Sequence, residues 1–164
     1  MPRVLLVDDD PDIRAWVSGV LEAFDYNVDV LPSDEGVLRV MNLGIIDLAL
    51  IDYHMPDKSG LTLLRDIRTA KISTPVVMLT ADNSQQLAVE CFRAGAVDFI
   101  TKPIDADYLN IVIERTLNAK STSLKNTAYR SMGYMQHKPE CSFHDDVGTC
   151  DCGLKDIFDS IQDF

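Results

Sequence analysis

Acidic residues stand at two points of this sequence where they could bind a cation or act as a nucleophile. Asp8, Asp9 and Asp10 form a run directly after a short apolar stretch, and Asp52 ends a second such stretch. Carboxylates held a few ångströms apart oppose each other's ionisation, so a cluster of them requires compensating positive charge. Mg²⁺ prefers carboxylate, water and phosphate oxygens as ligands. The pattern therefore indicates divalent-cation chemistry if the fold brings the two points together.

Two other polar residues follow apolar stretches in the same way. Thr80 comes directly after residues 75–79, and Lys102 comes shortly after residues 97–100. Each feature alone has an ordinary explanation, because an acidic run before a helix is commonly a cap and a single lysine is commonly solvated. Their joint occurrence after four separate apolar stretches is what indicates a site.

Short apolar runs alternate with segments of helical periodicity through residue 118. We predict strands over residues 4–7, 28–31, 46–51, 75–79 and 97–100. We predict helices over about 11–24, 33–44, 61–68, 83–94 and 105–117. Asp10 and Ser33 are the expected N-caps of the first two helices, while Gly44 and Gly95 are expected to end the second and the fourth.

This alternation of strand and helix favours an α/β fold with a doubly wound parallel sheet. Short, largely apolar strands suit a parallel sheet that is buried on both faces, and right-handed crossovers place helices on both sides. In such sheets a site forms beyond the carboxyl ends of the strands. The acidic residues, Thr80 and Lys102 all fall at that edge, so we expect them to share one site.

These residues also carry a resemblance to a known family. Over residues 1–120 the sequence resembles the receiver domain of two-component response regulators, in which a similar set of motifs occurs in the same order. The matching motifs are Asp8-Asp9, Asp52 with Met55-Pro56 and Gly60, Thr80-Ala81, Gly95-Ala96 and Lys102-Pro103. The resemblance implies a CheY-like, flavodoxin-like fold with five strands in the order 2-1-3-4-5. It also implies a cis peptide bond before Pro103.

The resemblance implies a role for each residue of the acidic site. Asp52 would accept a phosphoryl group from the phosphohistidine of a histidine kinase or a phosphotransfer protein. Asp9 and Asp52 would bind Mg²⁺ directly, Asp8 would help through water, and the main-chain carbonyl of His54 would supply another ligand. Such a chain is a phosphorylated signalling protein rather than an enzyme with a separate substrate, although it would catalyse its own phosphotransfer and a slow autodephosphorylation.

The same resemblance implies how the phosphoryl group would be sensed. Lys102 and the Thr80 hydroxyl would each bind a phosphoryl oxygen, and Thr80 would move toward Asp52. Phe99 would then fill the space that Thr80 leaves, by burial alone, because it lacks the hydroxyl of the tyrosine often found at this position. Asp82 and His54 flank the path of an attacking water in receivers and are candidates for setting the lifetime of the phosphoryl group. Asp82 would orient that water, whereas a solvated loop residue is the preferred interpretation of His54.

The C-terminal part of the sequence has a different character, with a predicted linker over residues 121–136 and a Cys/His-rich tail over residues 137–164. The candidate zinc ligands are Cys141, Cys150 and Cys152, with His144 preferred over His137 as the fourth. Structural zinc takes four such ligands in a tetrahedron. Free thiols in a disordered tail and a redox pair at Cys150 and Cys152 remain the alternatives. Cys91 stands apart in a predicted helix, where a buried thiol is expected.

An amphipathic stripe closes the chain. Its apolar members are Leu154, Ile157, Phe158, Ile161 and Phe164. About three helical turns are too short to be stable in isolation, so this segment is expected to dock on its own receiver, on a second protomer or on another protein. A homodimer is therefore one expected assembly.

Composition excludes several classes of function for the 164-residue chain. Its net charge of −11, from 15 basic and 26 acidic residues, disfavours direct DNA binding, which needs clustered Lys and Arg. No apolar run approaches the roughly 20 residues of a membrane span, and the early acidic residues exclude a signal peptide. We expect a cytoplasmic protein.

The sequence is compatible with three functions. The first is a phosphorylation-activated regulator that signals to an unknown downstream protein by protein–protein contact. The second is the N-terminal receiver part of a longer transcription factor or signalling enzyme. The third is a phosphatase of the haloacid-dehalogenase type, which would use Asp8 and Asp10 and would leave Asp52 and Lys102 unexplained.

Overall fold

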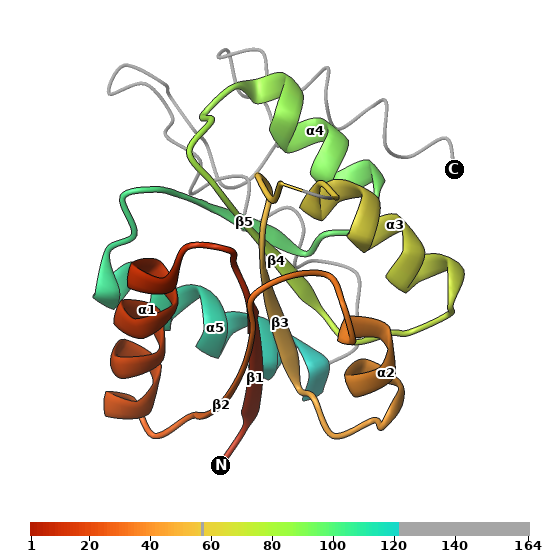
Figure 1. The fold of residues 1–164 in the computed structure, drawn as a ribbon. Coiled ribbons are helices and arrows are strands. Elements are labelled where there is room, and N and C mark those ends of the chain that lie inside the picture. Colours follow the sequence, from red (N-terminus) through yellow and green to blue (C-terminus); the bar gives the residue numbers. More distant parts are fainter. Residues whose placement is uncertain (57, 122–164) are drawn as a thin grey trace, which may run out of the picture. The chain divides into compact units, whose positions relative to one another are not determined.

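Five strands and five helices alternate along the described part of the chain (Figure 1), as the periodicity predicts. The computed structural model describes residues 1–56 and 58–121. The strands are β1 (Arg3–Val7), β2 (Asn27–Leu31), β3 (Leu48–Asp52), β4 (Val76–Thr80) and β5 (Asp98–Thr101). The helices are α1 (Pro11–Ala23), α2 (Val37–Asn42), α3 (Gly60–Thr69), α4 (Gln85–Arg93) and α5 (Ala106–Ser121).

The strands form one parallel sheet in the order β2-β1-β3-β4-β5, which confirms the predicted fold class and strand order. All five residues of β3 and of β4 are buried, because helices cover both faces of the central strands. The edge strand β2 instead has no fully buried residue. The order reverses between β1 and β3, and a parallel sheet of this kind places its site beside that point.

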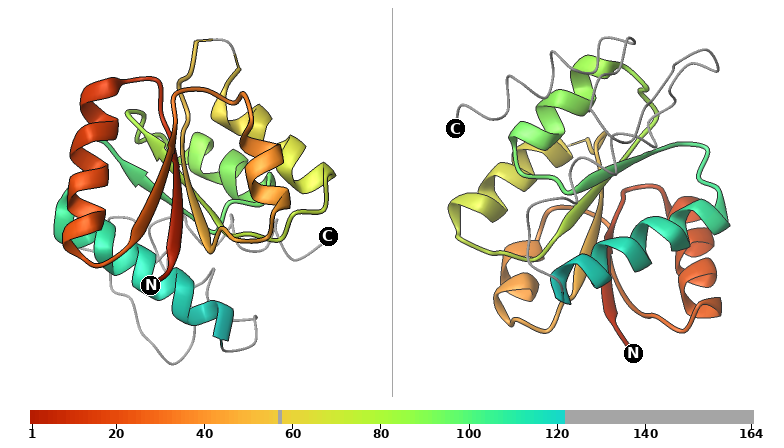
Figure 2. Two further views of the ribbon diagram at one scale, coloured as in Figure 1. Left: turned by 60° about the horizontal axis from the view of Figure 1, so that its bottom comes forward. Right: turned by 180° about the vertical axis from the view of Figure 1, so that it is seen from behind.

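Helices α1 and α5 cover one face of the sheet, and α2, α3 and α4 cover the other (Figures 1 and 2). Alternate residues of each strand face opposite sides, so the sheet divides the core into two clusters. Leu5 and Val7 pack with the α2–α4 layer, while Val4 and Leu6 pack with the α1–α5 layer. Each fully buried side chain of this size stabilises the fold by about 1.5–3 kcal/mol before entropy is counted. The backbone of the site is therefore held from both sides.

Helix α1 begins as the sequence predicts. Asp10 is its N-cap, and one carboxylate oxygen of Asp10 accepts hydrogen bonds from the main-chain N–H groups of Asp12 and Ile13 at 2.8 and 3.3 Å. Pro11 occupies the first helical position, where its missing N–H has no cost. The cap fixes the point at which the chain leaves the acidic run.

The predicted start of the second helix is wrong. Ser33 does not cap α2. Its hydroxyl accepts a hydrogen bond from the Glu35 N–H within a turn. The N-cap is Gly36, whose φ of 83° lies in the left-handed region that glycine adopts without a steric penalty. The predicted end is confirmed, because Gly44 also has a positive φ and donates to the carbonyl of Met41.

Several other boundaries shift by a few residues. The third strand runs from Leu48 to Asp52 rather than over 46–51, although Ile46 is buried. The fourth and fifth strands each begin and end one residue later than predicted, α4 is shorter, and α5 extends beyond residue 117. Apolar burial and strand hydrogen bonding do not begin at the same residue, which is why apolar runs misplace strand ends. In the described part of the chain, none of the helices has the length and apolar character that a membrane crossing requires.

Candidate functional site at the carboxyl edge of the sheet

The polar residues predicted from the four apolar stretches end or follow four adjacent strands of the sheet. Asp8 follows β1, Asp52 ends β3, Thr80 ends β4 and Lys102 follows β5. The main-chain N–H of Lys102 donates to the carbonyl of Thr80 at 2.7 Å, which ties the two strand ends together. The peptide bond between Lys102 and Pro103 is cis, as the family resemblance implies.

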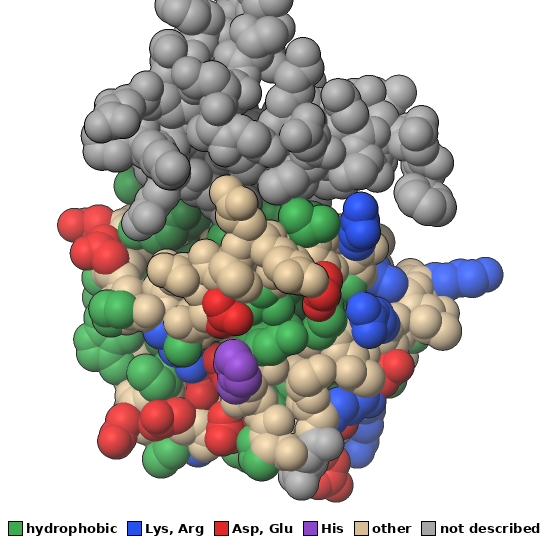
Figure 3. All heavy atoms as spheres, turned by 90° about the horizontal axis from the view of Figure 1, so that it is seen from above, with side chains coloured by type: hydrophobic (Ala, Val, Ile, Leu, Met, Phe, Trp, Pro, Cys, Tyr) green, Lys and Arg blue, Asp and Glu red, His purple; other side chains and the backbone are tan. Residues whose placement is uncertain are grey.

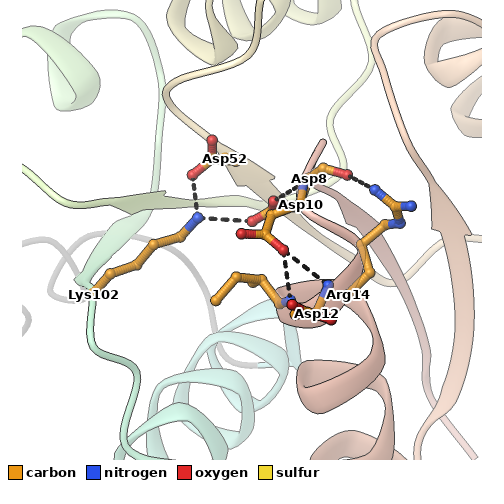
Figure 4. Close-up of polar contacts among 7 residues, drawn as sticks. Asp8, Asp10, Asp12, Arg14, Asp52 and Lys102 are labelled. Carbon is orange, nitrogen blue, oxygen red and sulfur yellow. Dashed lines mark hydrogen bonds and ion pairs between the residues drawn. The ribbon is translucent and has the colours of Figure 1, made fainter.

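Lys102 joins two of the carboxylates directly (Figure 4). Its Nζ lies 2.7 Å from Oδ1 of Asp52 and 2.8 Å from Oδ2 of Asp8. Asp52 is 3% exposed and Asp8 is fully buried, so solvent screens these ion pairs poorly. Burial raises the pKa of Asp52, the bond to Lys102 opposes this rise, and the charges of Asp8 and Asp9 add to it. Burial alone would lower the pKa of Lys102, but its bonds to Asp52 and Asp8 outweigh burial and raise it.

Asp8 is held by the protein at each of its polar atoms. Its Oδ1 accepts a hydrogen bond from the Asp10 N–H at 2.9 Å, and its Oδ2 is bonded to Lys102. Its main-chain N–H donates to the carbonyl of Leu31, and its own carbonyl accepts from the guanidinium of Arg14. Because both carboxylate oxygens already have protein donors, the geometry suits contact with a cation through water better than direct ligation.

The acidic cluster fits a divalent cation. Asp8, Asp9 and Asp52 each offer a carboxylate oxygen, and these ligand atoms all lie within 4.8 Å of one another. Asp9 is exposed and makes no polar side-chain contact with the described residues, so its oxygens are free to bind. Among the described residues only Lys102 forms an ion pair with this cluster, so negative charge is in excess. Oxygen ligands at a partly open, negatively charged position are what Mg²⁺ binds.

Asp10 does not join the cluster. Its side chain caps α1 instead, bonded to the N–H groups of Asp12 and Ile13 (Figure 4). A haloacid-dehalogenase site would require Asp10 to face Asp8, so this geometry contradicts that alternative.

Thr80 and Asp82 are bonded to each other. The Thr80 hydroxyl is almost completely buried and accepts a hydrogen bond from the Asp82 N–H at 3.0 Å. The carboxylate of Asp82 accepts in turn from the N–H of Ser84, the N-cap of α4. A movement of the Thr80 hydroxyl toward Asp52 would break its bond to the loop that leads into α4.

Phe99 lies on β5 in partial contact with solvent and packs against the core layer of α2, α3 and α4. Its ring meets that of Phe92 on α4 edge to face, with 6.1 Å between centroids. Phe99 therefore contacts α4, the helix that follows the loop bonded to Thr80.

The loop after β3 brings two rings to the site. His54 is exposed, and its ring meets that of Tyr53 edge to face with centroids 4.8 Å apart. The Tyr53 N–H donates to the carbonyl of Leu79 at 2.7 Å, which fixes the start of the loop to β4. Burial raises the pKa of Tyr53, and nearby Glu90 adds to the rise. The family resemblance predicts that the main-chain carbonyl of His54 is a ligand of the cation, and this stays a prediction.

Gly60 is a site residue whose physical role the sequence does not reveal. It begins α3, and its N–H donates to the carbonyl of Tyr53 at 2.9 Å. A Cβ at this position would lie against the main-chain carbonyl of Asp52, far inside van der Waals contact. Only glycine lets α3 approach the backbone of Asp52 so closely.

Lys58, on the same loop, pairs with Asp66 on α3 and with Asp34.

Figure 3 looks down on this end of the molecule. Acidic side chains gather toward the α1–α5 side, and most of the basic ones lie toward the α3–α4 side. A cation that approaches the acidic cluster is therefore attracted over a wider surface than its ligands alone.

The fold and this site together define a signalling receiver. Residues 4–114 match the family model of the response regulator receiver domain, so the chain belongs to that family. This match excludes the hydrolase alternative and confirms the family that the motifs predict.

Individual regulatory proteins are also similar to this chain in sequence. The sequence is 31% identical over 119 residues to the regulatory protein AtoC of Escherichia coli, and these residues cover 73% of this chain and 26% of AtoC. It is 36% identical over 107 residues to the transcriptional regulatory protein DltR of Streptococcus agalactiae, covering 65% of this chain and 48% of DltR. The chain thus spans about a quarter to a half of the length of these two relatives.

Solved receiver domains have the same fold. The receiver domain of the Francisella response regulator 1452 superposes with a TM-score of 0.70 at 30% identity, covering 73% of this chain and 99% of that one. The chemotaxis protein CheY4 of Vibrio cholerae gives a TM-score of 0.67 at 28% identity, covering 71% and 98%.

The candidate zinc ligands lie outside the described residues: His137, Cys141, His144, Cys150 and Cys152. The predicted linker and the amphipathic stripe fall there too, apart from residue 121 at the end of α5. Cys91 is 1% exposed on α4, which confirms its predicted burial, and burial raises the pKa of its thiol to about 11.

Proposed function

We propose that this chain is a phosphorylation-activated response regulator in which Asp52 accepts the phosphoryl group. A carboxylate oxygen of Asp52 forms the new P–O bond while the P–N bond of a phosphohistidine breaks and the released imidazole nitrogen takes up a proton. The observation that carries this proposal is the placement of Lys102, whose Nζ lies within 2.8 Å of both Asp52 and Asp8 in a cluster with excess negative charge.

Phosphoryl transfer requires mainly positioning and neutralisation of the phosphoryl oxygens. Lys102 supplies one positive charge at the Asp52 carboxylate, and the Thr80 hydroxyl is the donor for a second oxygen. Asp9 and Asp52 would hold Mg²⁺ with the His54 carbonyl, and Asp8 would act through water. When bound, the cation would neutralise charge on the phosphoryl oxygens and on the carboxylates.

The switch that follows would begin at the Thr80–Asp82 bond. A phosphoryl oxygen on Asp52 offers Thr80 a stronger, charged acceptor, so the hydroxyl would turn away from the Asp82 N–H. Phe99 would follow into the vacated space and change its contact with Phe92 on α4. The local exchange of one hydrogen bond would thereby bias the surface formed by α4, β5 and α5.

The phosphoryl group would then be lost by slow attack of water, without a separate substrate. Asp82 and the exposed ring of His54 are the side chains that we propose set this rate, because both lie in loops beside the site. The chain would therefore be no enzyme in the usual sense.

The partners follow from the same chemistry. The donor would be a cytoplasmic histidine kinase or phosphotransfer protein, and the output would be contact with a downstream protein, including a second copy of this chain. The relatives are regulatory proteins in which the matched residues are only one part. That observation favours a second candidate, in which these residues are the receiver part of a longer transcription factor.

Labelling with acetyl phosphate tests the proposal. We expect the wild-type chain to gain one phosphoryl mass in the presence of Mg²⁺ and Asp52→Asn to gain none. Asp12→Asn, an exposed carboxylate outside the cluster, is the matched control and should label like wild type. Undiminished labelling of Asp52→Asn would overturn the assignment of the phosphoacceptor.

We also propose that residues 1–120 form the receiver, residues 121–136 a linker, and residues 137–164 a small zinc-binding tail. Five zinc-compatible side chains fall between His137 and Cys152, which supports this proposal. Native mass spectrometry of the purified chain should find one zinc per chain, lost in the Cys150→Ser/Cys152→Ser variant. Absence of zinc after purification with the metal supplied would contradict it.

A further inference from the structure

Arg14 is a cation at an unfavourable place in its own helix. It is the fourth residue of α1, at the end of the first turn, where the exposed N–H groups create positive potential and acidic side chains are preferred. It is half-buried, although an arginine at the helix surface could reach solvent freely. The stability of α1 therefore does not explain an arginine at this position. The contact that Arg14 makes outside the helix is the remaining explanation.

That contact is to the main chain of the acidic site. Nη1 of Arg14 donates to the carbonyl oxygen of Asp8 at 2.8 Å (Figure 4). This carbonyl belongs to the peptide unit that joins Asp8 to Asp9. Because a peptide unit is planar, fixing its oxygen also fixes its N–H and the direction in which the Asp9 Cα leaves it.

Asp9 depends on this peptide unit more than Asp8 does. The side chain of Asp8 is already held by Lys102 and by the Asp10 N–H. Asp9 is exposed, and its carboxylate has no polar partner among the described residues. The position of the Asp9 carboxylate is thus determined by the backbone that carries it, together with its own rotamer.

We propose that Arg14 is a positioning residue for the divalent-cation site. By holding the Asp8–Asp9 peptide unit it keeps the Asp9 carboxylate where its oxygen can converge with those of Asp8 and Asp52. This inference rests on the proposed function, since it assumes that the acidic cluster binds the cation needed for phosphorylation. Arg14 acts through the backbone and touches neither the cation nor the phosphoryl group.

The charge of Arg14 alone predicts the opposite effect on cation affinity, so the direction in which affinity changes distinguishes the two roles. A positive side chain near the cluster repels a divalent cation, so a purely electrostatic role means that removing the charge tightens cation binding. Positioning means that removing the hydrogen bond weakens binding. Loss of an outer partner of a metal ligand typically weakens metal affinity by roughly 10–100-fold.

The test is a Mn²⁺ titration followed by electron paramagnetic resonance, with Mg²⁺ as competitor, on the full chain. Arg14→Met should bind Mn²⁺ roughly 10–100-fold more weakly than wild type. Arg14→Lys retains a donor and should recover part of the affinity. Arg39→Met, which removes an exposed arginine on α2, is the matched control and should bind like wild type. Circular dichroism in EDTA checks that each variant is folded, and Arg14→Gln, whose shorter side chain cannot reach the Asp8 carbonyl, replaces Arg14→Met if that variant does not fold.

A double-mutant cycle with Asp9→Asn tests the route. If Arg14 acts through Asp9, Arg14→Met causes little further loss of affinity in the Asp9→Asn background. Unchanged or tighter binding by Arg14→Met, or full additivity with Asp9→Asn, would overturn the inference. Failure of wild type itself to bind Mn²⁺ and to take up phosphoryl from acetyl phosphate would instead overturn the proposed function, so the two failures are distinguishable.

Discussion

Two buried charge clusters of this molecule adjoin the same edge strand, β5, and they are built differently. At the start of β5, Asp98 is 2% exposed and forms an ion pair with Arg115 of α5. Its carboxylate also accepts from the N–H of Phe99. Just beyond the end of β5, Lys102 meets Asp52 and Asp8 while Asp9 adds a third carboxylate. The first cluster pairs a carboxylate with a cation, whereas the second leaves negative charge in excess.

We interpret the first cluster as charge that stabilises the fold and the second as charge that a bound cation would balance. Burial raises the pKa of Asp98, and the ion pair with Arg115 opposes that rise. The acidic cluster contains more negative charge than its lysine can balance, an imbalance that a bound cation would relieve. Unbalanced buried charge is thus the better indicator of function in this structure.

Breaking the balanced pair should have the largest effect on stability. Arg115→Met leaves Asp98 buried without its cation, and we expect the free energy of unfolding to fall by about 3–5 kcal/mol. Urea denaturation followed by circular dichroism measures this change. The double variant Asp98→Leu/Arg115→Met removes both charges and should recover a large part of the loss. A double variant no more stable than Arg115→Met would contradict the role given to the pair.

Crowding the backbone of the acidic site should have the next largest effect. Gly60→Ala places a methyl group against the carbonyl of Asp52, so α3 has to shift, and we expect a loss of about 1–3 kcal/mol. Gly19→Ala on α1 is the matched control, because a Cβ there meets nothing within 4 Å. Phosphorylation by acetyl phosphate should slow in Gly60→Ala and stay normal in Gly19→Ala. Equal stability of the two variants would show that the close approach is not needed.

Removing charge from the acidic cluster should act in the opposite direction. In EDTA, Asp52→Asn relieves repulsion, while Lys102 keeps its bond to Asp8, and we expect the variant to be more stable than wild type by about 0.5–2 kcal/mol. Added Mg²⁺ should stabilise wild type more than the variant, because ligand binding favours the state that binds it. Thermal denaturation with and without Mg²⁺ measures both effects. Destabilisation of Asp52→Asn in EDTA would contradict the excess-charge argument.

The ionisation of Cys91, a buried thiol, should have the smallest effect on the stability of the fold, because it is felt only at high pH. Burial raises the pKa of the Cys91 thiol from its ordinary 9.0 to about 11, so its contribution to stability is fully present below pH 9 and is lost as the pH rises through 11. In a Cys141→Ser/Cys150→Ser/Cys152→Ser background, iodoacetamide should label Cys91 at pH 8 only after denaturation. The urea midpoint should fall between pH 9 and 11, less so in Cys91→Ala. Rapid labelling of the native chain would show that the thiol is accessible.

The sequence predicted element types and order because apolar periodicity is a local property. It also predicted that Asp8, Asp52, Thr80 and Lys102 lie at one edge, because parallel strands bring their carboxyl ends together whatever the details of packing. Ser33 was misassigned as a cap since a left-handed residue such as Gly36 starts α2 instead, and that choice depends on the turn that precedes the helix.

Contacts between distant side chains were not predictable in the same way. The pair of Asp98 and Arg115 depends on how α5 lies along the sheet, and periodicity does not specify that orientation. The role of Gly60 depends on the approach of α3 to Asp52. Arg14 did give a local signal, a cation in the first turn of a helix, but its partner is visible only in the folded chain.

The most direct test of the central claim is to locate the phosphoryl group chemically. The chain is incubated with acetyl phosphate, with Mg²⁺ or with EDTA, then reduced with borohydride, which converts an aspartyl phosphate to homoserine, and sequenced by tandem mass spectrometry. We expect homoserine at position 52, dependent on Mg²⁺ and absent when Lys102 is replaced by Met. Homoserine at another aspartate, or none at all in a folded wild-type chain, would contradict it.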